Sequence, residues 1–255
     1  SLTEEEIARG LATHSSGNHA QAVALSAKNL GTKAYIVMPS NAPEIKKQAT
    51  RGYGAEITLC EPTLEAREST LAEVVARTGA TFIHPFDNYN VIAGQASCAK
   101  ELIEDTPILD VIISPVGGGG LMSGTALSSK YFSPNTAVYG AEPEIVNDAY
   151  RSMQSGKLEV NTNTDTIADG LKTNLSEKTF EIIREDVKEI FTVSEEEITN
   201  AMRIIWERLK IIIEPSCAVP FAAILKHPEP FSQRKVGVIL TGGNVDVNKL
   251  PFTKH

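Results

Sequence analysis

Short apolar runs alternate with helix-like segments along most of the chain. Ser194 precedes Glu197 by three residues, which predicts a capping box at a helix start. Apolar residues at helical spacing come after it. Alternating strands and helices are typical of parallel sheets that are covered by helices on both faces. The pattern therefore predicts an α/β fold. The strand-like runs are residues 11–14, 33–38, 55–60, 81–85, 110–116, 137–143 and 236–243.

The alternation is interrupted near residues 86–91, between two sets of strands and helices. We interpret this point as the crossing from a smaller domain, residues 10–86, to a larger domain, residues 87–255. Ligands of open parallel sheets bind beyond the carboxyl ends of the strands. Three predicted strands are followed by polar loops, and these loops are expected to converge on one crevice. They are residues 15–19, 117–120 and 241–244.

Composition excludes several classes of partner. The net charge is −8 and the chain has no basic run, which argues against nucleic acid and anionic membrane surfaces. No apolar stretch approaches the length of a membrane span, and the acidic N-terminus does not resemble a signal peptide. Cys60, Cys98 and Cys217 are widely spaced, so we expect buried thiols in a reduced, cytoplasmic protein rather than a zinc site or disulfides.

A glycine-rich stretch, "VGGGGLMSG" at 116–124, follows a predicted strand and opens a helix. Backbone N–H groups at a helix start bind phosphate, and glycine allows the phosphate to approach closely. The stretch is not a dinucleotide fingerprint, because Met122 stands where a third glycine belongs, and Thr125 replaces the lysine of a P-loop. A tight turn with positive φ is the alternative. Four successive glycines favour phosphate.

Together, the loops "SSGNHA", "GGGG" and "TGGN" resemble those of fold-type II pyridoxal-phosphate enzymes. Within that group the sequence is most similar to serine racemases and to serine/threonine and hydroxyaspartate dehydratases. The resemblance covers residues 10–246 and implies two open twisted parallel-sheet domains of the tryptophan synthase β-like kind. Further agreement comes from "GYGAEI" (52–57), "IAGQ" (92–95), "AEP" (141–143), "TIADG" (166–170) and "EPSCA" (214–218).

The resemblance implies a set of residues that bind pyridoxal phosphate. Asn18 would hydrogen-bond the ring hydroxyl, and Thr241 would face the pyridine nitrogen. A hydroxyl can accept from or donate to that nitrogen without forcing its full protonation, which would temper the ring as an electron sink. The phosphate would lie on Gly117, Gly118, Gly119 and Gly120.

The substrate, a small amino acid, would place its carboxylate on the loop 15–19. Ser15, Asn18 and His19 offer donors there, beside the backbone N–H groups of a helix start. Arg67 resembles an arginine that helps to close the small domain over acidic ligands. An exposed helix arginine is the alternative for this residue.

Ser16 separates the possible activities. Threonine-specific dehydratases usually have alanine at this place, whereas racemases and some dehydratases of 3-hydroxy amino acids have serine. Racemisation needs a proton donor on the face opposite the Schiff-base lysine, and the resemblance gives that catalytic role to Ser16. The alternative is that Ser16 only caps the helix that follows.

The resemblance also implies a divalent cation, Mg²⁺ or Ca²⁺, held by Glu142, Asp148 and the carbonyl of Val146, away from the ring. A solvated acidic loop is the alternative. The same resemblance suggests a homodimer and leaves ATP open as an activator. The histidines outside the loop 15–19 that lie near predicted elements are interpreted as structural; they are His14, His84 and His227.

The Schiff-base lysine of the family lies in a Ser/Ala-Phe-Lys-x-Arg-Gly motif upstream of the asparagine loop. This sequence contains no such motif, and the lysines in its first helices lack the flanking glycine and arginine. We therefore expect that a first segment of the large domain is absent. That absence would expose a sheet edge and leave the chain as written inactive.

The predicted function of the intact protein is interconversion of L-serine and D-serine, with elimination to pyruvate and ammonia. A threonine or 3-hydroxyaspartate dehydratase is the first alternative, and Ser16 argues only against threonine specificity. A non-catalytic remnant that binds a small molecule is the second alternative.

Overall fold

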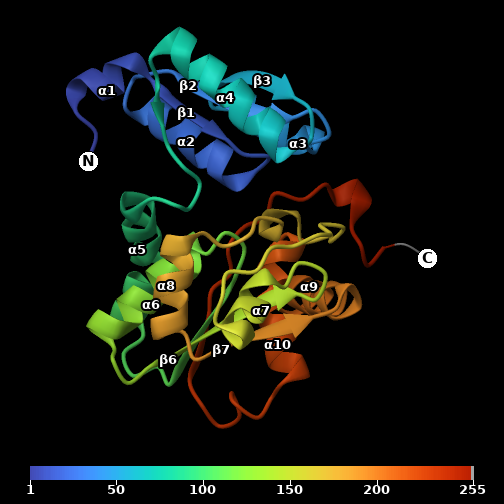
Figure 1. Ribbon diagram of the computed structural model, residues 1–255. Coiled ribbons are helices and arrows are strands. Elements are labelled where there is room, and N and C mark those ends of the chain that lie inside the picture. The colour runs from blue at the N-terminus through green and yellow to red at the C-terminus, as the bar shows by residue number, and fades with distance from the viewer. Residues whose placement is uncertain (254–255) are drawn as a thin grey trace. The chain divides into compact units, whose positions relative to one another are not determined.

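The computed structural model describes residues 1–253. The chain divides into two compact units, Ser1–Pro85 and Phe86–His255. Each unit contains one four-stranded sheet, and every strand pair in both sheets is parallel (Figure 1). The α/β class with two parallel sheets is therefore confirmed.

The first unit has the strand order β3-β2-β1-β4. Successive side chains of a strand point to opposite faces, so Leu11 and Ile36 pack against α2 while Ala12 and Val37 pack with the apolar side of α4. Its elements are α1 (Glu4–Arg9), β1 (Leu11–His14), α2 (Asn18–Asn29), β2 (Ala34–Pro39), α3 (Glu44–Gly52), β3 (Glu56–Cys60), α4 (Leu64–Thr78) and β4 (Thr81–Phe82).

The second unit has the strand order β7-β6-β5-β8. From β5, Val111 and Ile113 join the apolar cluster of α9 and α10, whereas Ile112 joins the cluster beside α5. Its elements are α5 (Tyr89–Asp105), β5 (Val111–Pro115), α6 (Gly120–Phe132), β6 (Ala137–Pro143), α7 (Asp148–Ser155), η1 (Asp169–Leu171), α8 (Glu177–Asp186), β7 (Glu189–Val193), α9 (Glu195–Leu209), α10 (Pro215–Lys226), β8 (Val236–Val238) and η2 (Val247–Lys249).

Two strands end well before the sequence predicts, β4 and β8. β4 stops early because the Ile83 carbonyl accepts from side chains, Thr13 Oγ1 at 2.8 Å and His19 Nε2 at 3.2 Å. Beyond β8, the Thr241 N–H donates to Cys217 Sγ at 3.1 Å. Side chains thus take the backbone groups that a longer ladder would use.

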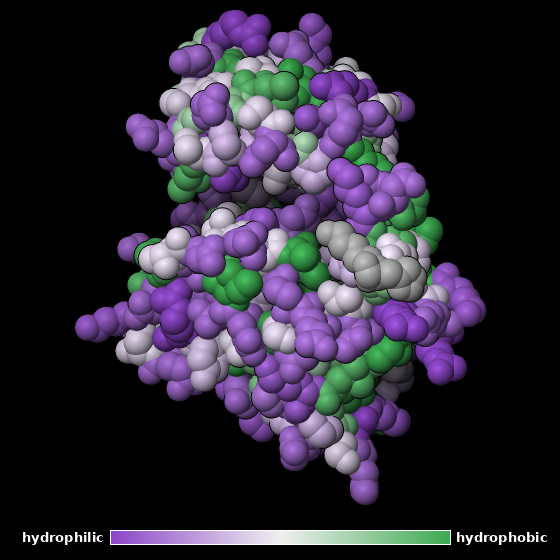
Figure 2. Space-filling view, turned by 90° about the vertical axis from the view of Figure 1, so that its right-hand side faces the viewer, coloured by the Kyte–Doolittle hydropathy of each residue, from purple (hydrophilic) through white to green (hydrophobic). Residues whose placement is uncertain are grey.

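Polar side chains predominate on the face drawn in Figure 2, with apolar patches between them. No helix among residues 1–253 is long and apolar enough to cross a membrane. β8 is an edge strand, and an apolar groove of about 380 Å³ lies beside it. Cys217 is buried as predicted, but Cys60 is half-buried and Cys98 is exposed, which corrects the expectation of three buried thiols.

Candidate functional site

The loop 15–19 connects β1 to α2 at the carboxyl end of the first sheet. Gly17 is the N-cap of α2 and no side chain caps this helix, so Ser16 does not act as its cap. Ser15 Oγ accepts from the Gly17 N–H at 3.3 Å, while Ser16 is half-buried and Asn18 is exposed. The first turn of α2 therefore presents backbone N–H groups that suit a carboxylate.

Lys46 was not singled out by the sequence, because it looks like a surface residue of α3. It is only 3% exposed, and a Cβ at position 17 would lie 3.3 Å from its Nζ. The lysine side chain thus packs directly on the loop and explains why a glycine precedes Asn18. A lysine among helical residues offers no signal of this burial in the sequence.

His14 and Arg67 lie close together beside the same loop. The His14 ring stacks on Phe82 with 5.8 Å between ring centroids, and His84 completes an aromatic group. Burial, followed by the charges of Arg67, His84 and His19, lowers the pKa of His14 from 6.5 to about 4. Arg67 is half-buried, and its Nε donates to the Thr63 carbonyl at 3.3 Å. The arginine is thus not a fully solvated helix residue.

The lowered pKa of His14 predicts a loss of stability in acid. The unfolded chain takes up the proton near pH 6.5, but the folded chain takes it up only near pH 4. The unfolded state therefore binds more protons between these values, so the melting temperature should fall as the pH drops from 6.5 to 4. His14→Phe keeps the ring stacking and should make this fall shallower in a thermal-melt series. An unchanged slope would contradict the assignment.

His19 is anchored by its side chain rather than free for a ligand. Its Nε2 lies 3.2 Å from the Ile83 carbonyl, and a carbonyl only accepts, so Nε2 carries the proton. Burial lowers the pKa of His19, which favours the neutral ring. Nδ1 is then an acceptor. This differs from the prediction that His19 donates to a substrate carboxylate, and it indicates a role in holding the loop.

In the second unit, two of the predicted loops lie at one sheet edge. β5 pairs in parallel with both β6 and β8, so the segments that follow these strands leave the sheet on the same side. The glycine loop follows β5 and Thr241 follows β8. The loop 15–19 belongs to the other unit, so convergence of all three loops stays a prediction.

The geometry of the glycine loop fits a phosphate. Gly119 is the N-cap of α6 in the left-handed region, with φ +86°, and no side chain caps the helix. A Cβ on Gly118 would lie 2.3 Å from the Phe86 ring, and a Cβ on Gly120 would lie 3.0 Å from the Phe86 Cβ. The backbone is therefore tightly packed from behind, and its N–H groups at the helix start are not used by a capping side chain.

Thr241 is exposed, and the buried thiol of Cys217 lies against it. Burial raises the pKa of this thiol. The Gly242 N–H, the Thr241 N–H and the Thr241 side chain hydrogen-bond the sulfur, and these bonds act in the opposite direction. The turn after β8 is thus wrapped around Cys217, a residue that the sequence did not single out for this role.

Two buried carboxylates belong to Glu142 of β6 and to Asp148, the first residue of α7. Glu142 accepts from the Tyr150 N–H at 2.8 Å, and Asp148 accepts from the Leu175 N–H at 2.8 Å. Burial and then the charge of Asp148 raise the pKa of Glu142 well above its usual value. Val146 is buried in the turn between them. A cation between the two carboxylates would offset the burial and repulsion that raise the pKa of Glu142. Within residues 1–253 no group of three or more acidic, histidine or cysteine side chains could hold a metal.

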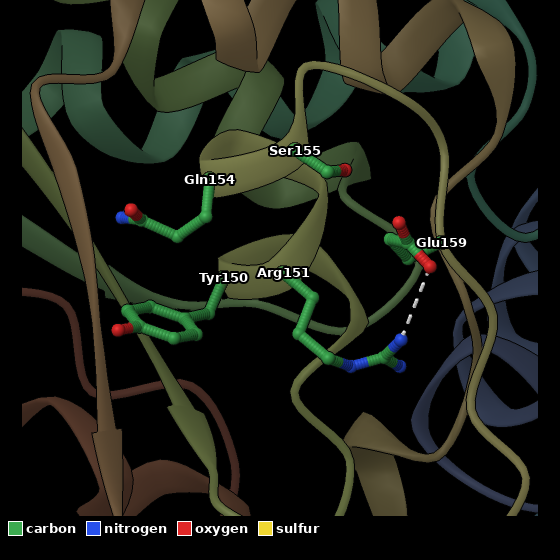
Figure 3. A pocket seen from close by; sticks show the side chains of 5 residues that line it. All are labelled: Tyr150, Arg151, Gln154, Ser155 and Glu159. Atoms are coloured by element: carbon green, nitrogen blue, oxygen red, sulfur yellow. Dashed lines mark hydrogen bonds and ion pairs between the residues drawn. The ribbon is translucent and has the colours of Figure 1, made fainter.

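A surface pocket of about 370 Å³ adjoins α7 (Figure 3). Arg151 extends across it to Glu159, and its guanidinium also donates to the Asn161 side chain at 3.0 Å. Asn161 Nδ2 in turn donates to Asp148 Oδ1 at 2.6 Å. Arg151 therefore holds the segment that contacts one of the two carboxylates. The pocket is lined by Tyr150, Arg151, Gln154, Ser155 and Glu159.

Comparison with known proteins decides the family. A family model described as "Pyridoxal-phosphate dependent enzyme" matches residues 1–242. The chain belongs to this family. It is 48% identical to a β-hydroxyaspartate dehydratase of Paracoccus denitrificans over 98% of this chain and 80% of that protein. It is also 48% identical to a serine racemase of Dictyostelium discoideum over 98% of this chain and 78% of that protein.

Solved structures of two serine racemases agree with these matches. The crystal structure of the Dictyostelium serine racemase has a TM-score of 0.90, with 97% of this chain and 80% of that chain covered. The maize serine racemase has a TM-score of 0.94 at 40% identity, with 97% and 77% covered. The resemblance inferred from the three loops is therefore confirmed, and the family includes both racemases and dehydratases.

Proposed function

We propose that the protein racemises serine and eliminates it to pyruvate and ammonia. The observation that supports this proposal is the placement of the uncapped glycine N-terminus of α6 and of Thr241 at one sheet edge. A phosphate and a pyridine nitrogen are the two ends of pyridoxal phosphate, and these two elements suit them. The cofactor itself follows from the family.

This placement suggests two of the groups that would hold pyridoxal phosphate, and the family resemblance adds Asn18. The backbone of Gly117, Gly118, Gly119 and Gly120 would bind the phosphate, Thr241 would bind the ring nitrogen, and Asn18 would bind the ring hydroxyl. When bound, the cofactor supplies an electron sink that makes the Cα proton of an amino acid removable. The Thr241 hydroxyl would hydrogen-bond the ring nitrogen without placing a negative charge beside it, so it would not force that nitrogen to be fully protonated.

The chain's own residues would orient the substrate and move its proton. The N–H groups that begin α2, with Ser15, would bind the substrate carboxylate. Ser16 Oγ would hold or return the proton at Cα on one face, which racemisation needs and elimination does not.

Calorimetric titration with pyridoxal phosphate tests the binding half of the proposal on this chain. Turnover is measured on a chimera that adds the parts of the Dictyostelium relative outside the matched residues. We expect saturable cofactor binding, and both D-serine and pyruvate from L-serine. Absence of cofactor binding would overturn the proposal, and binding without any product would favour the non-catalytic alternative.

A 3-hydroxyaspartate dehydratase is the second candidate, and Arg67 beside His14 favours it. The half-buried arginine offers a cation for a second carboxylate, which 3-hydroxyaspartate has and serine lacks. The Paracoccus relative bears this activity in its name. Competition between L-serine and 3-hydroxyaspartate separates the candidates, because the dehydratase should prefer the dicarboxylate and lose that preference in Arg67→Gln.

We further propose that Glu142, Asp148 and the Val146 carbonyl bind Mg²⁺ or Ca²⁺. At a concentration of 100 times the Kd, the ion should stabilise the fold by about 2.7 kcal/mol, which raises the melting temperature by roughly 5–10 °C. Chelation should reverse the gain. Asp148→Asn should abolish it, whereas Asp165→Asn, an exposed acid in the following loop, should not. A melting temperature that the chelator leaves unchanged would contradict the proposed cation site.

A homodimer, activation by ATP and a cytoplasmic location complete the proposal. The first two rest on the family resemblance, and the location rests on the number and wide spacing of the cysteines. Sedimentation of the chain at increasing concentration, and cofactor affinity with and without ATP, test the first two. A concentration-independent monomer or an affinity that ATP leaves unchanged would count against them.

A further inference from the structure

The glycine loop needs something to fix the direction of its N–H groups. Gly118 and Gly119 share one peptide plane, and in a trans peptide the carbonyl of the first residue points opposite to the N–H of the second. No cis peptide occurs within residues 1–253. A donor that holds the Gly118 carbonyl therefore also sets where the Gly119 N–H points. Glycine has no side chain to do this by itself.

Thr179, the third residue of α8, provides that donor. Its side chain is fully buried, and its Oγ1 lies 3.0 Å from the Gly118 carbonyl oxygen. Two other oxygens lie slightly farther from the same hydroxyl, Ser176 Oγ at 3.1 Å and the Ser176 carbonyl at 3.2 Å. A hydroxyl has one proton, so it donates to one acceptor at a time, and the shortest of the three contacts is to the Gly118 carbonyl. A Cβ on Gly119 would lie 2.8 Å from the Thr179 Cβ, so the fit is close.

We propose that Thr179 is a positioning residue for the phosphate loop. Its hydroxyl holds the Gly118 carbonyl against α8, so the Gly119 N–H faces away from α8 and toward the phosphate. This inference rests on the proposed function, in which the glycine loop binds the cofactor phosphate. Thr179 touches neither cofactor nor substrate and acts only through the peptide between Gly118 and Gly119.

The role makes a specific demand on binding. A fixed N–H matters only for a ligand that bears a phosphate. Loss of the Thr179 hydroxyl should therefore weaken the binding of a phosphorylated ligand and leave the binding of its unphosphorylated form unchanged. If Thr179 only stabilised the fold, its loss would weaken the binding of both ligands equally.

The test compares pyridoxine 5′-phosphate with pyridoxine, which differ by the phosphate and have no reactive aldehyde. Thr179→Val keeps the shape but removes the hydroxyl, and we expect about tenfold weaker binding of pyridoxine 5′-phosphate in calorimetry. Pyridoxine affinity should be unchanged. Thr179→Ser retains the hydroxyl and should restore the affinity for the phosphate ester to within about twofold of the unmodified chain.

Ser176→Ala is the matched control for helix stability. Ser176 Oγ accepts from the Thr179 N–H at 3.3 Å and also lies 3.1 Å from Thr179 Oγ1. This variant therefore weakens the start of α8 and removes one partner of the Thr179 hydroxyl, but it leaves that hydroxyl in place to donate to the Gly118 carbonyl. It should lower the melting temperature without changing the affinity ratio of the two ligands. Equal losses for both ligands in Thr179→Val, or the same ratio change in Ser176→Ala, would overturn the inference. If the unmodified chain binds both ligands equally, the proposed function fails first and the inference fails with it.

Discussion

Gly124→Ala should lower the free energy of unfolding by about 3 kcal/mol, at the upper end for overpacking. Gly124 lies in α6 where that helix meets α5, and a Cβ there would lie 2.6 Å from the Ala96 nitrogen and 2.8 Å from the Ile92 carbonyl oxygen. Both contacts are backbone atoms of a helix, so no side chain can rotate away. The two helices would have to separate. The melting temperature should fall by roughly 6–12 °C in calorimetry.

Gly94→Ala is the control for this prediction. Gly94 is an exposed residue of α5, and a Cβ there would meet nothing within 4 Å. Alanine is the better helix former, so this variant should gain about 0.5–1 kcal/mol. If the free energy of unfolding falls in Gly124→Ala and rises in Gly94→Ala, the loss in Gly124→Ala is due to close packing of the two helices. A small loss in Gly124→Ala would mean that α5 shifts at little cost.

Ser16→Ala should reduce formation of D-serine by about 10²- to 10⁴-fold in the chimera used for turnover. The Ser16 hydroxyl is the group proposed to return a proton to Cα on one face of the substrate. Alanine removes this hydroxyl without enlarging the side chain. Elimination to pyruvate needs no proton on that face, so its rate should stay within severalfold. Chiral chromatography for D-serine and a coupled assay for pyruvate measure both products in one reaction.

The ratio of the two products separates the proposed role of Ser16 from a general disturbance of the loop. Ser69→Ala, an exposed serine of α4 in the same unit, should leave both rates unchanged. A parallel loss of both products in Ser16→Ala would indicate that the serine positions the loop or the substrate. Retained racemisation would assign the second proton to another group.

Much of the fold was predictable because its signals are local. Ser194 caps α9 through the expected box with Glu197, and Gly79 ends α4 with φ 71°. Buried strands such as β5 are continuous apolar runs, which the sequence reveals directly. The family was predictable because three short loops occur in a fixed order, although each loop alone is a weak signal.

The remaining features depend on contacts between distant segments. The turn after β8 is held by Cys217, which is 24 residues from Thr241 in the chain. Thr179 is 61 residues from the carbonyl it holds, and its sequence context suggests only a helix start. Buried Lys46 and the anchored ring of His19 likewise follow from tertiary packing. Hydrophobic periodicity contains no information about such hydrogen bonds.

The burial of Cys217 under the turn that contains Thr241 has a kinetic consequence. A thiol-directed reagent can reach this sulfur only when the turn lifts away, whereas Cys98 is exposed and reacts without any opening. The alkylation rate of Cys217 relative to Cys98 therefore measures how often the turn opens. A ligand that bridges Thr241 and the glycine loop should slow that reaction and leave Cys98 unaffected. Peptide mass mapping of the two adducts would then report site occupancy without any assay of turnover.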